Sequence, residues 1–74
     1  MERFLLFIRD TAAADDVADI HPDESSARKA LAAYVRRRTR EQGRPMPIND
    51  DVAIASYFEA DGALYAIARI SPAR

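Results

Sequence analysis

A chain of 74 residues that contains no cysteine has few ways to hold a stable fold together. A domain this short buries only about 60% of the surface that its unfolded form exposes, so such domains often gain stability from disulfides, metals or a partner subunit. The lack of cysteine removes disulfides and every thiolate metal site. We therefore expect residues 1–74 to form one small domain that is stabilised by self-association.

The composition is that of a folded protein that does not cross a membrane. With 49% hydrophobic and 31% charged residues, the chain is too apolar to be a disordered tail. Its longest apolar run, residues 4–8, is far shorter than the roughly 20 residues that span a bilayer. No small-residue cleavage site follows the first residues, so we expect a cytoplasmic protein. The preference for arginine over lysine and the abundance of alanine are typical of a GC-rich bacterial genome.

The first element is a predicted strand over residues 3–10. Five consecutive apolar residues between charged ends are too few for a buried helix. Alternation points Leu6 and Ile8 to one face and Leu5 and Phe7 to the other, so both faces of this strand need cover. Residues 16–21 alternate only weakly, and whether they form a short edge strand stays open.

The clearest helix signal begins at Asp23, a good N-cap that follows Pro22. From residue 24 to about residue 42, small or large apolar residues recur at helical spacing and define one buried face. Gly43 is the residue type expected just beyond the C-terminus of a helix. The apolar face consists of Ala27, Ala30, Leu31, Tyr34 and Val35.

Residues 51–59 and 63–70 are both rich in β-forming residues and are separated by Asp61-Gly62, a dipeptide favoured in tight hairpins. This pattern predicts a hairpin with a small face, which carries the alanines, and a large apolar face. The predicted fold class is therefore α+β: one helix packed on a three- or four-stranded antiparallel or mixed sheet, in the order β-(β)-α-β-β. We expect the helix to cover the alanine face of the hairpin.

The large apolar face of the predicted hairpin is the expected interface of a homodimer. A single helix can shield only one side of the sheet, and an apolar patch left uncovered on a soluble protein usually marks an association site. Arg69, on the same face, is expected at the rim or paired with an acid. The expected interface residues are Val52, Ile54, Phe58, Tyr65 and Ile67.

An arginine cluster near the end of the predicted helix is the most conspicuous polar feature. Guanidinium groups suit phosphate, so the cluster is a candidate nucleic-acid site. Successive helical residues diverge by about 100°, however, and the net charge of −1 gives no general basic field. A solvated helix end, a phosphate site and a surface for an acidic protein are the three interpretations. The candidate phosphate-binding residues are Arg36, Arg37, Arg40 and Arg44.

Neither a metal site nor a catalytic set emerges from the remaining residues. The acidic stretch around His21 lacks the spacing of an EF-hand, and two glycines are too few for a phosphate-cradling loop. No serine can be placed beside a base. We therefore expect no cofactor, no metal and no enzyme activity. The expected function is a small non-enzymatic interaction or regulatory protein that acts as a homodimer; the alternative is a nucleic-acid-binding regulator that uses the arginine-rich helix end.

Overall fold

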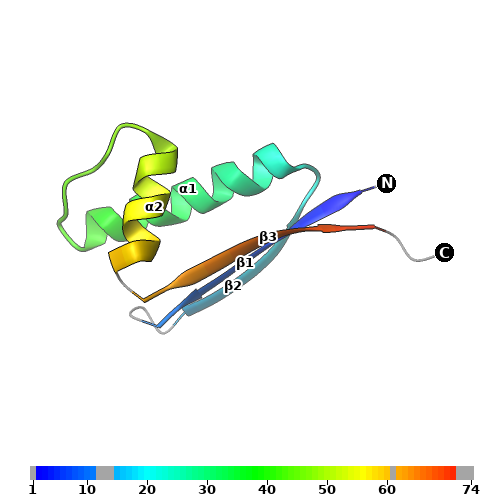
Figure 1. The fold of residues 1–74 in the computed structure, drawn as a ribbon, viewed down its shortest axis with the longest axis horizontal. Helices are drawn as coiled ribbons and strands as arrows, with labels where there is room; N and C mark the ends of the chain where they lie inside the picture. Colours follow the sequence, from blue (N-terminus) through cyan, green and yellow to red (C-terminus); the bar gives the residue numbers. More distant parts are fainter. Residues whose placement is uncertain (1, 12–14, 61, 72–74) are drawn as a thin grey trace.

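The computed structural model describes residues 2–11, 15–60 and 62–71 and contains five elements in the order β-β-α-α-β. The strands are β1 (Arg3–Asp10), β2 (Asp15–His21) and β3 (Leu64–Ile70), and the helices are α1 (Glu24–Glu41) and α2 (Asp50–Ala60). The three strands form one antiparallel sheet in the order β2-β1-β3. Both helices lie on the same side of this sheet (Figure 1). The fold is thus an α+β fold of two layers.

Three sequence predictions are confirmed by these elements. β1 occupies residues 3–10, as its short apolar run indicated. α1 begins after Asp23, whose side chain accepts a hydrogen bond of 2.7 Å from the backbone N–H of Ser26. It is followed by Gly43 at φ +70°, where the N–H groups of Gly43 and Arg44 close a Schellman motif on the carbonyls of Arg40 and Thr39. The open question of a strand near residues 16–21 is answered by β2.

The predicted hairpin over residues 51–70 is wrong in its first half. Residues 50–60 form α2, so β3 has no hairpin partner and pairs instead with β1. Apolar residues at 53, 54, 57 and 58 also match helical spacing, and Asn49 caps the helix by accepting hydrogen bonds from the N–H groups of Asp51 and Val52. Gly62 does have a positive φ of +67°, but it lies between a helix and a strand, and Asp61 lies outside the described residues.

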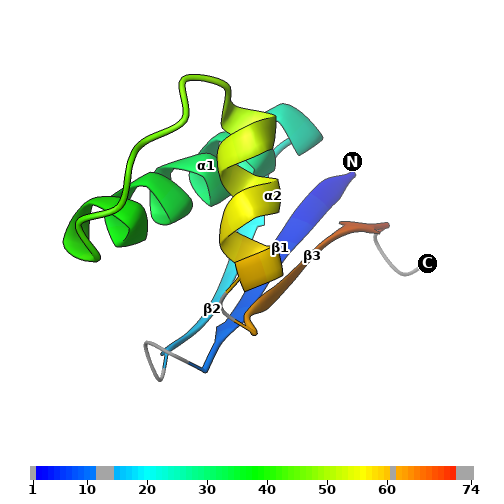
Figure 2. The same ribbon diagram turned by 60° about the vertical axis from the view of Figure 1, so that its left-hand side comes forward.

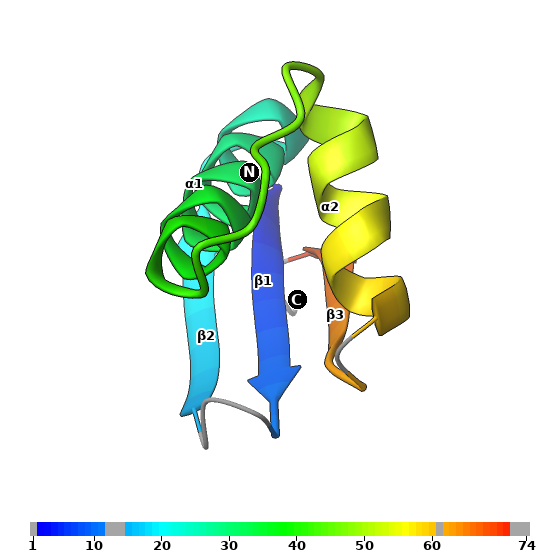
Figure 3. The same ribbon diagram turned by 90° about the vertical axis from the view of Figure 1, so that its left-hand side faces the viewer.

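The core lies between the helices and one face of the sheet. Leu6 and Ile8 of β1 are fully buried beneath Leu31 and Val35 of α1 and Ile54 of α2, with small residues Ala27, Ala32, Ala53 and Ala63 completing the cluster. Seen along the sheet, α1 lies on the side of β2 and α2 on the side of β3 (Figure 3). The expected cover of the alanine face by the helix is therefore wrong, because Ala66 and Ala68 belong to the opposite face of the sheet from Ile67 and the core.

Candidate functional site

The face of the sheet that carries no helix is the candidate functional site. Strand alternation sends Leu6, Ile8 and Asp10 of β1 beneath the helices, and these three side chains are buried. Leu5 and Phe7 therefore point to the other side of the sheet, and neither belongs to the core cluster. In Figure 1 both helices lie above the sheet, and no helix or strand of the described residues lies below it.

The strand register brings apolar residues of all three strands together on this side. Leu5 lies between Ile20 and Ala68, and Phe7 lies between Ala18 and Ala66. The neighbouring rows add Leu64 and Ile70. We call this surface the open face; its apolar residues are Leu5, Phe7, Ala18, Ile20, Leu64, Ala66, Ala68 and Ile70.

The open face is apolar at its centre and charged only at its margin. Ile20 is 60% exposed, Leu64 51% and Ile70 39%, so large side chains on both flanking strands contact water. Arg9 and Asp16 share the row at one end and form an exposed ion pair of 3.7 Å. Contiguous apolar patches of this kind are uncommon on soluble monomers and usually mark association sites.

Large and small side chains lie next to each other on the open face. Leu5 and Phe7 stand on the central strand, and each is flanked by at least one alanine on a neighbouring strand. Ala66 and Ala68 follow one another along the same side of β3, so this strand presents small side chains beside the larger Leu5 and Phe7. A row of large side chains next to a row of small ones can interdigitate with another copy of the same surface.

The structure separates the five residues expected at the interface. Val52 lies on α2 and is 52% exposed, whereas Ile54 on the same helix is buried in the core. Phe58 packs at 4.8 Å from Tyr65, measured between ring centroids, and with Ile67 it lies on the helix side of the sheet. These residues therefore do not share one sheet face. The residues that β1 and β3 contribute to the open face follow from the alternation of these two strands, once β3 is paired with β1.

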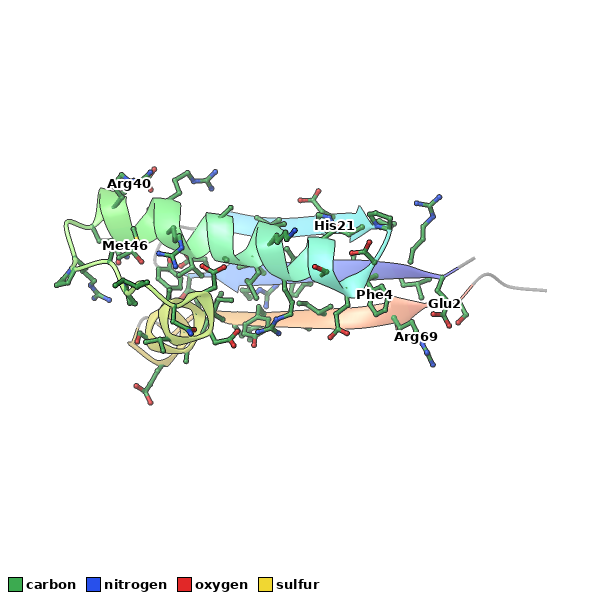
Figure 4. The ribbon with its side chains drawn as sticks, turned by 90° about the horizontal axis from the view of Figure 1, so that it is seen from above. Glu2, Phe4, His21, Arg40, Met46 and Arg69 are labelled. Atoms are coloured by element: carbon green, nitrogen blue, oxygen red, sulfur yellow. The ribbon has the colours of Figure 1, made fainter. Side chains whose placement is uncertain are left out.

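The candidate phosphate-binding arginines are also distributed differently. Arg36 donates hydrogen bonds to the carbonyls of Pro47 and Ile48 and pairs with Asp50 at 2.6 Å, so it holds chain segments together. Arg37 lies over the ring of Tyr34, 5.3 Å from its centroid. Arg40 and Arg44 are exposed. Figure 4 places Arg40 at the same end of the molecule as Met46, far from Glu2 and Arg69.

Sequence reasoning missed a buried polar cluster around Asp10. Its carboxylate, on a side chain with no exposed surface, accepts a hydrogen bond of 2.8 Å from the hydroxyl of Tyr34 and a second one from the hydroxyl of Tyr57. The guanidinium of Arg38 lies 3.6 Å from the same oxygen and donates to the Tyr57 hydroxyl. Burial, together with the hydrogen bond to Asp10, raises the pKa of Tyr57, while Arg38 acts in the opposite direction.

This cluster joins β1 to both helices. Tyr34 comes from α1 and Tyr57 from α2, and their rings meet edge to face at 6.3 Å. Because no solvent reaches the Asp10 side chain, a dissolved substrate cannot reach it either. The arrangement is that of a structural cross-link, since a buried carboxylate is tolerated only when it is paired and hydrogen-bonded.

Three further sequence predictions concern metal ions, membrane spans and the position of Arg69. Among the described residues, no group of three or more acidic or histidine side chains is arranged to hold a metal ion. Neither described helix is long and apolar enough to cross a bilayer. Arg69, expected at a rim or beside an acid, is exposed and lies 3.4 Å from Glu2.

Comparison with known proteins finds no matching family model, no matching curated protein and no matching solved structure. A functional assignment therefore depends on the surfaces of this chain alone.

Proposed function

We propose that this chain is a small non-enzymatic interaction protein that works as a homodimer, with the open faces of two copies packed against each other. The observation that carries the proposal is the apolar open face, which has both helices on its far side. Burying the open face between two copies would add stability to a domain that has a thin core and no disulfides.

A second copy fits the open face because the surface is complementary to itself. In a two-fold pair, Leu5 and Phe7 of each copy can pack against the small side chains of Ala66 and Ala68 of the other. Sheets that pack face to face in this way lie about 10 Å apart with interdigitated side chains. The charged residues Arg9 and Asp16, already paired with each other, would stay at the rim in water.

The size of the open face predicts a reversible dimer. Three strands of about seven residues, about 4.8 Å apart, present roughly 350 Å² in projection on each copy. Two such faces, roughly 700 Å² in projection, are smaller than the roughly 1,200 to 2,000 Å² of stable specific interfaces, so the pair would be weak and transient. We therefore expect a dissociation constant of roughly micromolar order, with the two-fold pair dominant at about 100 μM.

Sedimentation equilibrium at about 100 μM tests this proposal. The wild-type protein should have twice the 8.3 kDa mass of the chain. Phe7→Asp, which places a charge at the centre of the open face, should be a monomer. Val52→Asp is the matched control, since it adds the same charge at an exposed position on α2, and it should remain a dimer.

A folded wild-type monomer at that concentration would contradict the proposal, as would a dimer that survives Phe7→Asp. Because Phe7 lies on the central strand, circular dichroism must show that the variant is folded. Leu64→Lys, at a half-exposed position on an edge strand, is a milder variant with the same expected result.

Nucleic-acid binding at the arginine-rich end of α1 is less well supported. Arg36 and Arg38 are occupied within the fold by Asp50, Asp10 and Glu41. An affinity for DNA or RNA that is tighter than micromolar at physiological salt, and that falls steeply with added salt, would favour this alternative.

A further inference from the structure

The linker between the two helices, residues 43–48, presents one apolar side chain entirely to solvent. Ile48 is 99% exposed, compared with 60% for Ile20 and 52% for Val52. Met46, two residues earlier, is 37% exposed. Figure 2 shows this linker arching over the helices on the side away from the sheet.

The position of Ile48 makes its exposure unusual. It directly precedes Asn49, the residue that caps α2, and an apolar residue at this point commonly packs against the fourth residue of the helix. That fourth residue is Ala53, which is buried in the core, but Ile48 does not fold back onto it. Ile48 therefore contributes no burial to the fold of its own chain.

Hydrogen bonds hold the backbone of the linker in this outward arrangement. The guanidinium of Arg36 donates to the carbonyl of Pro47 at 2.7 Å and to the carbonyl of Ile48 at 2.8 Å. The same group bonds Asp50 in the first turn of α2, with its Nε 2.9 Å from the carboxylate. One side chain of α1, Arg36, thus holds the backbone of Pro47 and Ile48 in place.

Both ends of the linker are fixed as well. The Schellman motif at Gly43 sets its start, and the cap at Asn49 sets its end. Pro45 and Pro47 restrict the backbone between them. A loop that is already ordered loses little conformational entropy on binding, which favours affinity.

We propose that this linker is a preformed docking loop whose Ile48 enters an apolar pocket of a second, different protein, with an acidic rim that faces Arg40. Arg40 is exposed and forms no ion pair within the described residues, and it lies at the same end of the molecule as Met46 (Figure 4). Met46, a flexible side chain two residues before Ile48, can adapt to the edge of such a pocket.

The charges around the linker favour a protein over a lipid surface or a nucleic acid. Asp50 and Glu41 lie close to it, and both are neutralised by arginines of α1. The exposed arginines near the linker, Arg40 and Arg44, are too few for the six to ten phosphate contacts of a typical nucleic-acid complex. One inserted isoleucine is also less apolar than a single acyl chain, which by itself gives only marginal membrane binding. A protein pocket can enclose one such side chain completely.

The docking loop and the open face lie on opposite sides of the molecule (Figures 1 and 2). A homodimer joined through its open faces would therefore display two docking loops, one on each outer side. The docking-loop proposal rests on the chain being an interaction protein, but it does not rest on dimerisation. Phe7→Asp should accordingly retain partner binding at one partner per chain, so failure of the dimer and failure of the loop can be distinguished.

The partner can be sought by photo-crosslinking in the cells that make this protein. A photoreactive amino acid at position 46 lies beside Ile48 without replacing it, and the same amino acid at position 55 of α2 is the background control. A protein that crosslinks only from position 46 is identified by mass spectrometry and purified. Its affinity for the wild-type chain and the variants is then measured by calorimetry.

The variants separate the anchor from the residue that positions it. Ile48→Ser should weaken binding of the purified partner about tenfold or more, because it removes the buried apolar side chain. Arg36→Lys keeps a positive charge beside Asp50 but loses the paired carbonyl contacts, so it should weaken binding and raise the backbone mobility of residues 46–48 in NMR relaxation. Val52→Ser, the half-exposed control, should bind as the wild type does.

Three results would overturn the proposal. The first is an Ile48→Ser variant that binds the purified partner as tightly as the wild type, or the absence of any crosslink specific to position 46. The second is a fall of several degrees in the melting temperature of Ile48→Ser, which would make Ile48 a structural residue. The third is binding to anionic vesicles or to DNA that Ile48→Ser abolishes, which would assign the loop to those ligands instead.

Discussion

Asp10 shows how much one residue can carry in a domain of this size. It is a charged side chain with no exposed surface, and it is tolerated because two tyrosine hydroxyls and a guanidinium surround it. Removing Asp10 takes away the carboxylate that accepts from both buried hydroxyls and faces Arg38, which costs far more than the loss of an exposed ion pair.

We therefore expect Asp10→Ala to lower the free energy of unfolding by about 3 to 5 kcal/mol. Asp16→Ala, which removes the exposed ion pair with Arg9, should cost less than about 1 kcal/mol. Urea denaturation of both variants tests this contrast. Equal losses would mean that the Asp10 cluster contributes nothing beyond an ordinary surface pair.

Tyr57 links this cluster to the stability of the protein at high pH. Burial raises its pKa in the folded state above the value of about 10 that it has in the unfolded chain. Above that pH the unfolded chain therefore binds fewer protons than the native one, and stability must fall as the pH rises through the folded pKa. Below pH 10 the contribution of Tyr57 is constant.

We expect the free energy of unfolding to decrease more steeply above about pH 10 in the wild type than in Tyr57→Phe, which lacks the ionising group. Urea denaturation at several pH values gives both slopes. The Phe variant should also be less stable at neutral pH, because Asp10 loses a hydrogen bond. Parallel slopes would show that the Tyr57 pKa is the same in the two states.

At the scale of elements, α2 is the segment whose local pattern is ambiguous. Its eleven residues place Val52, Ile54 and Phe58 on one side if extended, but Ala53, Ile54 and Tyr57 on one side if helical. In the structure, Ala53, Ile54 and Tyr57 lie in the core, as the helical arrangement requires. Ion pairs of Asp50 with Arg36 and of Asp51 with Arg28 fasten the first turn of α2 to α1.

Ala55 distinguishes a helix from a strand at this point, because it is exposed in the middle of α2. In a helix, Ala55→Gly should destabilise the protein by about 1 kcal/mol and Ala55→Val by about 0.5 kcal/mol. In a strand, valine would instead be as good as alanine or better. Urea denaturation of the two variants therefore reports the conformation of this segment directly.

At the scale of the whole molecule, the sheet has one covered face and one open face. The two helices follow one another along the chain and both pack on the same side, so the other side has no cover within the described residues. A homodimer joined through the open face, as we propose, should have a stability that depends on protein concentration.

We expect the melting temperature of the wild type to rise by up to about 4 °C for each tenfold increase in protein concentration, the value for a dimer of this length that unfolds to separate chains. Phe7→Asp should melt at a temperature independent of concentration. Differential scanning calorimetry over a wide concentration range gives this result. A wild type whose melting temperature is constant would argue against a dimer.

The sequence by itself determined the elements whose signals are local. β1 is set by an apolar run that is too short for a helix, and α1 by an N-cap at Asp23, a helical stripe and Gly43 beyond its end. The prediction that one sheet face would carry no helix named the wrong face, because Ala66 and Ala68 of the expected helix-covered face belong to the open face. β1 and α1 both follow from residues within about one turn or one strand of each other, which is the range over which capping and periodicity act.

Only the tertiary structure decided what depends on distant contacts. Residues 50–60 became a helix because α1 offers a surface for Ala53, Ile54 and Tyr57 and arginines for the first turn. Once that segment was a helix, β3 had to pair with β1, and this pairing fixed which residues form the open face. The uses of Arg36 and Asp10 were likewise settled by partners 11 or more residues away, which no local pattern specifies.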